Sequence, residues 1–166
     1  DEARRWCGRD PTWRDVAARC ALLERLAGDR TSADHWLNLV ESLDARRAGL
    51  LRAEIALAEW RPLDAEQILS PLVGSHPDDA HALDLLSTAL ASQRRWDEAL
   101  VLVGDLERRH PAEIAWKIRR AEWVYRRAPS APALRALEDL VKDHARRLDA
   151  RLALAGSYAE AGKLQQ

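Results

Sequence analysis

The chain has 166 residues, of which 47% are hydrophobic, and this apolar content is enough for a buried core and argues against a disordered chain. The 26 basic and 27 acidic residues give a net charge of −1, which provides no overall attraction to nucleic acid or to an anionic membrane surface. No apolar run approaches the roughly 18 residues that a membrane-spanning helix needs.

Residues 1–45 predict two helices. Apolar residues at helical spacing cover 12–27 and 32–43, and Gly28 is a natural stop for the first of these helices. Cys7 lies before the first helix and Cys20 lies on it. A disulfide between them would indicate an oxidising compartment such as the periplasm, whereas two unpaired cysteines fit a reducing cytosol. The sequence leaves both alternatives open.

Pairs of helices follow, because Ala and Leu recur at helical spacing while β-branched residues are few and no alternation is sustained. In the central pair, Asp78 or Asp79 can cap the first helix. A polar turn at 92–95 separates it from the second, which runs from Trp96 to before Pro111. The other expected helices cover 46–60, 62–75, 114–127, 132–144 and 148–161.

The helix pairs share a period of 34 residues. A small residue recurs in each first helix, and an alanine, two apolar residues and a histidine recur in each second helix. A period of this size indicates a solenoid, in which each repeat buries surface against its neighbours. The recurring positions are Ala53, Ser87, Ala121 and Ala155; Ala65, Ala99 and Ala133; Leu69, Val103 and Leu137; Leu72, Leu106 and Leu140; and His76, His110 and His144.

This pattern, over about 46–166, closely resembles the tetratricopeptide repeat (TPR), whose length and helix-turn-helix unit it shares. The resemblance implies an all-α fold, a right-handed α-solenoid of antiparallel helix pairs. Two features depart from the family pattern. Arg52 and Arg120 stand where a leucine is usual, and residues 128–132 replace a glycine-containing turn. We therefore expect the third unit to open at an altered angle.

The expected organisation follows this register, with 1–45 as a degenerate N-terminal repeat or cap. Residues 46–79 and 80–113 are repeats, 114–147 is an irregular repeat, and 148–166 is a truncated repeat with its first helix only. Because the chain lacks Met and stops where a second helix is due, we expect a piece of a longer TPR protein or a processed product. The excess of Arg over Lys, 23 to 3, favours a GC-rich bacterial source. The last helix has more apolar surface than one neighbour covers, so it is a candidate for association with another chain.

In the TPR family, first helices line a concave groove that binds extended or helical segments of partner proteins. Carried over by position, the resemblance implies a groove whose apolar residues are framed by acids, which suits a partner with apolar and some basic side chains. The family's clamp for a peptide's terminal carboxylate uses Lys, Arg and Asn, and the acids here argue against that kind of partner. The expected groove residues are Arg47, Leu50, Glu54, His81, Asp84, Thr88, Ile118, Glu122, Tyr125, Asp149 and Leu152.

The third unit also carries a stripe of Trp and Arg at helical spacing. An anionic or sugar polymer is one candidate ligand, held by stacking and ionic contacts. The alternative, which we favour, is that the Trp side chains pack between helices, because Trp is highly buried on average. The Trp/Arg stripe consists of Trp116, Arg119, Arg120, Trp123, Arg126 and Arg127.

The recurring histidines predict helix ends rather than a metal site. Equivalent points of stacked helices lie roughly 8–10 Å apart, too far for nitrogens that must meet within about 2.1 Å of one ion. An imidazole at a helix C-terminus interacts favourably with the dipole and the free carbonyls. The loose group of His76, His81, Asp78 and Asp79 matches no standard metal spacing. The sequence has no phosphate loop, nucleophile elbow or metalloprotease motif, so we expect no catalytic residues, metal or cofactor.

The expected function is a non-catalytic protein-interaction scaffold that binds a partner segment in its groove, within a larger bacterial secretion or polysaccharide-export assembly. Two alternatives stay open: direct binding of an anionic or sugar polymer through the Trp/Arg stripe, and a non-catalytic arm of an enzyme. The expected partner is a protein or peptide, not nucleic acid, without direct membrane insertion. The periplasm and the cytoplasm both stay open as the compartment.

Overall fold

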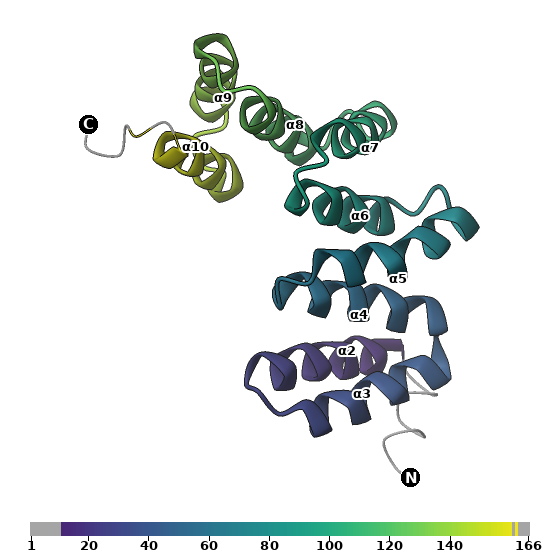
Figure 1. The fold of residues 1–166 in the computed structure, drawn as a ribbon. Coiled ribbons are helices and arrows are strands. Elements are labelled where there is room, and N and C mark those ends of the chain that lie inside the picture. The colour runs from purple at the N-terminus through teal and green to yellow at the C-terminus, as the bar shows by residue number, and fades with distance from the viewer. Residues whose placement is uncertain (1–10, 161, 163–166) are drawn as a thin grey trace. The chain divides into compact units, whose positions relative to one another are not determined.

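The structure is a computed structural model that describes residues 11–160 and 162 (Figure 1). Within these residues every regular element is an α-helix. Each helix overlaps a range expected from the sequence, because the apolar spacing and the end signals are local properties of the chain. The helices are α2 (Pro11–Leu26), α3 (Arg30–Leu43), α4 (Ala45–Ala58), α5 (Pro62–Ser75), α6 (Ala80–Ser92), α7 (Trp96–Arg109), α8 (Ile114–Arg127), α9 (Ala131–Asp143) and α10 (Leu148–Glu160).

The chain divides into two compact units, one up to Ala89 and the other from Leu90, so the boundary falls within α6. In the first unit α4 packs against α2, α3 and α5, and α2 packs against α3. In the second unit α8 packs against α7 and α9, and α10 packs against α8 and α9. Within each unit, helices thus pack against neighbours in sequence (Figure 1), which is how repeat arrays bury their apolar faces.

The first of the two recurring apolar positions of the second helices is fully buried. Leu69, Val103 and Leu137 have no exposed surface. Burial of a side chain of this size contributes roughly 1.5–3 kcal/mol relative to its exposure. The residues that repeat at this position therefore supply packing rather than a binding surface.

The small-residue position of the first helices is less uniform than the sequence suggests. Ala53 and Ser87 are fully buried, but Ala121 is half-buried and Ala155 is exposed. The small residues that α10 buries are instead Ala150, Ala153 and Ser157. Ala150 and Ser157 stand in register with buried residues of the earlier first helices, such as Ala48 and Ile55, so α10 keeps the buried face that the 34-residue register predicts there.

The three recurring histidines lie at helix ends. His76, His110 and His144 are the C-cap residues of α5, α7 and α9. Each donates its backbone N–H to the carbonyl of the residue four positions earlier, at 2.9, 2.9 and 3.0 Å. The prediction that the recurring histidines mark helix C-termini is confirmed.

The turns between paired helices repeat a backbone conformation that the sequence did not reveal. Trp60 and Arg94 are one 34-residue period apart, Gly162 follows Arg94 by two periods, and the three have positive φ angles of 58°, 62° and 70°. Ala128, at the equivalent position of the third pair, has φ −144°. The turn at 128–132 thus differs from the other turns in its local backbone conformation, and the altered opening angle of the third unit stays a prediction.

Candidate functional site

Four of the expected groove residues line one small pocket in the first unit, which we call the α4–α6 pocket. It has a volume of about 50 Å³ and is lined by Arg47, Leu50, Leu51, Glu54 and His81. Leu50 and Leu51 are only 5% and 4% exposed, so they form an apolar floor. The three polar side chains form the rim. Such a site can receive the end of a single side chain of a partner, since larger ligands need pockets of about 300 Å³ or more.

A hydrogen bond between α4 and α6 fixes part of this rim. Nε2 of His81 lies 2.7 Å from Oε1 of Glu54. This bond is the main cause that raises the pKa of His81 above its usual value, because the imidazolium form is favoured beside a carboxylate. The α4–α6 pocket therefore presents a carboxylate flanked by two basic side chains, those of Arg47 and His81.

Asp79 sets the start of the helix from which His81 projects. Its Oδ1 accepts the backbone N–H groups of His81 and Ala82 at 3.1 and 3.2 Å, which is an N-cap interaction for α6. Its Oδ2 also pairs with Arg46 on α4. Of the two residues that the sequence offered as caps, Asp79 fulfils this role in the structure.

The remaining groove residues of the first unit lie farther along α6. Asp84 and Thr88 are half-buried, and neither lines the α4–α6 pocket. Thr88 Oγ1 donates to the backbone carbonyl of Asp84 at 3.0 Å. Oδ1 of Asp84 is buried, so the carboxyl group of this residue is only partly accessible.

In the second unit, two of the expected groove residues are buried. Ile118 is 2% exposed and Tyr125 is 3% exposed. Ile118 packs in one cluster with Ala150 and Ala153 of α10, which shows that the following helix covers it. Both residues are too buried to offer surface to a partner, contrary to the sequence expectation, and for Ile118 the cause is the packing of α10 against α8.

The other three groove residues of the second unit have separate roles. Glu122 is half-buried and pairs with Arg126 at 2.8 Å, and burial raises the pKa of its carboxyl. Asp149 pairs with Arg147 at 2.7 Å, and Leu152 is 62% exposed. The structure does not bring these residues together into one pocket of the kind seen at α4 and α6.

The Trp/Arg stripe of α8 is divided between packing and ion pairs. Trp123 is 6% exposed, and the Arg119 guanidinium carbon lies 5.7 and 5.8 Å from the ring centroids of Trp116 and Trp123. Burial lowers the pKa of Arg119, and the position of its guanidinium over both indole rings is a cation–π arrangement. The other arginines form the ion pairs Arg120–Glu107, Arg126–Glu122 and Arg127–Asp97.

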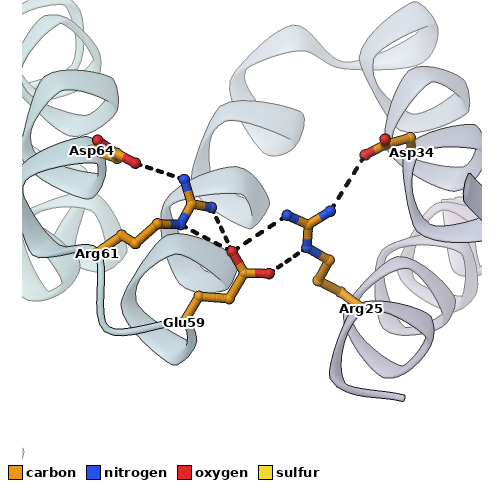
Figure 2. A network of polar contacts seen from close by, with 5 residues as sticks. All are labelled: Arg25, Asp34, Glu59, Arg61 and Asp64. Atoms are coloured by element: carbon orange, nitrogen blue, oxygen red, sulfur yellow. Dashed lines mark hydrogen bonds and ion pairs between the residues drawn. The ribbon is translucent and has the colours of Figure 1, made fainter. Parts of the chain in front are cut away.

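A network of ion pairs in the first unit was missed by the sequence analysis (Figure 2). Glu59, directly after α4, pairs with Arg25 of α2 and with Arg61, whose Nη2 lies 2.6 Å away. Arg25 also reaches Asp34 at 4.0 Å, and Arg61 pairs with Asp64 at 2.6 Å. The hydrogen bond from Arg25 is the main reason why the pKa of Glu59 falls to about 2.

One signal in the sequence could have pointed to this network. Arg25 and Glu59 are 34 residues apart, which is one repeat period. Residues one period apart lie on adjacent repeats of a solenoid, so opposite charges at that spacing are candidates for an ion pair. This spacing is not evident in the sequence, because the recurring small and apolar residues do not keep the 34-residue period before residue 46.

Three further expectations concern a metal site, a membrane-spanning helix and a disulfide. Among the described residues, no group of three or more His, Cys, Asp and Glu side chains could hold a metal ion. None of the helices in the described ranges is long and apolar enough to cross a membrane. The proposed disulfide partner of Cys20, Cys7, lies outside the described residues.

Two solved structures of MamA AMB-1 are similar to this chain. One has a TM-score of 0.58 and 15% sequence identity, and the alignment covers 92% of this chain and 91% of that chain. The other has the same TM-score and identity over 94% and 86%. The fold is TPR-like. This confirms the fold class expected from the sequence, an all-α helical solenoid. At 15% identity the likeness concerns the fold alone. No protein-family model and no curated protein matches the sequence.

Proposed function

We propose that this chain is a non-catalytic protein-interaction scaffold that binds a segment of a partner protein at α4 and α6. The observation that carries the proposal is the α4–α6 pocket, where four residues expected in a TPR groove line the same small cavity. The TPR-like fold supports it, because rigid preformed helices lower the ordering cost on this side of an interface.

The α4–α6 pocket also indicates the chemistry of the segment. The leucine floor suits a small apolar group, and the carboxylate of Glu54 can accept a hydrogen bond from a donor group next to it. Glu54 is about one-third exposed, at 31% of its side-chain surface, so a partner can reach it without unfolding the helix pair. The proposed segment therefore carries an apolar side chain beside a hydrogen-bond donor.

Quantitative affinity capture with the chain as bait tests this proposal. The pocket variant is Glu54→Lys, and the matched control is Glu98→Lys on α7, which also removes a paired glutamate. We expect a partner that binds the wild-type chain and the control but not the pocket variant. The bound segment of that partner, made as a peptide, should lose at least about tenfold in affinity for Glu54→Lys by calorimetry.

Equal binding by both variants would show that the α4–α6 pocket is not the contact surface. The identity of the captured proteins also tests the narrower part of the proposal, that the chain works in a bacterial secretion or polysaccharide-export assembly. Components of such an assembly among the Glu54-dependent partners are the expected result.

A further inference from the structure

The second unit carries a larger open surface depression between α7 and α8, which we call the α7–α8 trough. Its volume is about 690 Å³. The two helices pack against each other within this unit (Figure 1). The trough is separate from the α4–α6 pocket and shares no residue with it. None of the groove residues expected from the sequence lines it.

The floor of the α7–α8 trough is apolar and open. Leu100, Val101 and Gly104 line it from α7, and Val101 is 71% exposed. A Cβ atom added at Gly104 would meet no atom within 4 Å, so the absence of a side chain leaves unfilled space above the helix. An exposed valine beside such a gap is an apolar surface that a second molecule can cover.

The rim of the α7–α8 trough is predominantly basic. Arg108, Lys117 and Arg120 line it, together with a single carboxylate, Glu107. Arg120 pairs with Glu107 at 3.2 Å, and Arg108 pairs with Asp105 at 2.9 Å. Both arginines are more than half exposed, and exposed ion pairs contribute little stability, so a ligand carboxylate can replace these partners at small cost.

We propose that the α7–α8 trough binds an amphipathic segment of a partner protein that carries acidic side chains beside apolar ones. The apolar floor receives the apolar side chains, and the basic rim pairs with the acids. This is the arrangement by which an amphipathic segment lies in a groove. A nucleic acid fits less well, because no aromatic side chain lines the trough to stack on bases.

Filling the trough tests its apolar floor. Gly104→Leu places a side chain in the open space, and leucine also favours the helix, so the variant should fold. The matched control is Gly74→Leu, since Gly74 is also helical and also has nothing within 4 Å of an added Cβ. The probe is a fluorescent peptide of three Glu-Leu-Leu-Asp units, and its binding to the full chain is followed by anisotropy. We expect a loss of about tenfold or more in Gly104→Leu and no change in Gly74→Leu.

Charge reversal tests the basic rim. Lys117→Glu should weaken the peptide by about tenfold and reduce the salt dependence of binding, whereas Lys142→Glu on exposed α9 surface should not. A peptide with lysine in place of every acid should not bind the wild-type chain. The proposal is overturned if both leucine variants bind the acidic peptide like the wild type. It is also overturned if single-stranded DNA binds more tightly than the peptide and is weakened by Lys117→Glu.

Discussion

Trp123 shows how one side chain changes the role of its neighbours. Ile55, Ala89, Trp123 and Ser157 are spaced by 34 residues and all are buried, but only Trp123 is an aromatic residue. The Arg119 guanidinium carbon lies 5.8 Å from the Trp123 ring centroid, and Arg119 is half-buried. The packing alternative therefore describes Trp123 and Arg119, whereas Arg120, Arg126 and Arg127 form ion pairs.

The carboxylate of Glu59 leads to a prediction about how the stability of the chain depends on pH. Its pKa is lowered from 4.5 to about 2 in the folded chain, so the folded state favours the carboxylate. The resulting stabilisation is fully present above about pH 4.5 and is lost as the pH falls toward 2. We expect Glu59→Gln to lose about 1–2 kcal/mol at pH 7 and to lose most of this acid dependence, measured by urea unfolding at pH 7 and pH 3.

The matched control for this residue is Glu98→Gln. Glu98 also pairs with an arginine, Arg95, but both side chains are more than one-third exposed. Because water screens such a pair, the effect on unfolding should be smaller than for Glu59→Gln. An equal loss for the two variants would contradict the view that the network of Figure 2 holds α2 against the end of α4.

At the scale of the elements, backbone strain is found in the turns between paired helices. Trp60 and Arg94 are non-glycine residues in the left-handed region, whereas Gly162 meets the same requirement without a Cβ. A left-handed conformation costs an ordinary residue roughly 1–2 kcal/mol. Trp60 is also 88% exposed, so its indole contributes little packing within the chain to offset this cost.

Arg94→Gly should therefore stabilise the chain. Relief of the left-handed strain exceeds the entropy that glycine loses on folding, and we expect a net gain of about 0.5–1 kcal/mol in urea unfolding. The control is Ala128→Gly one period later, where φ is −144° and glycine relieves nothing. This second variant should be neutral or slightly destabilised. A gain of equal size at both positions would mean that backbone strain is not the cause.

At the scale of the whole molecule, the repeat period distributes stability over two compact units. Solenoid repeats contact their neighbours only, so we expect a change in one unit to act mainly on that unit. Leu69 in the first unit and Leu137 in the second are both fully buried and stand at the same place in the 34-residue register. Truncation of either leucine to alanine therefore removes an equivalent part of the core, in the first unit for Leu69 and in the second for Leu137.

We expect Leu69→Ala and Leu137→Ala each to remove about 2–5 kcal/mol from the unit that contains the substitution. Hydrogen exchange read by mass spectrometry should show faster exchange over α2–α5 for the first variant and over α7–α10 for the second. Faster exchange over both sets of helices in either variant would show that the chain unfolds as one cooperative block.

The helices and their ends were predictable from the sequence because their causes are local. Apolar spacing determined where α4, α5 and α8 lie, and the C-cap positions of the three recurring histidines follow from the same register. In the candidate site, position within the repeat predicted Arg47, Leu50, Glu54 and His81, and it missed only Leu51 of the α4–α6 pocket. These features depend on neighbours along one helix or on the equivalence of repeats.

Only the tertiary structure decided which residues reach the surface. Ile118 stands on the expected groove face, yet α10 covers it, because burial depends on the helix that arrives from elsewhere in the chain. The pairing of Arg25 with Glu59 joins residues on different helices in the same way. The sequence determined the period, the helices and the fold class of this protein. The packing of one helix on another determined which of its charged and apolar side chains remain available to a partner.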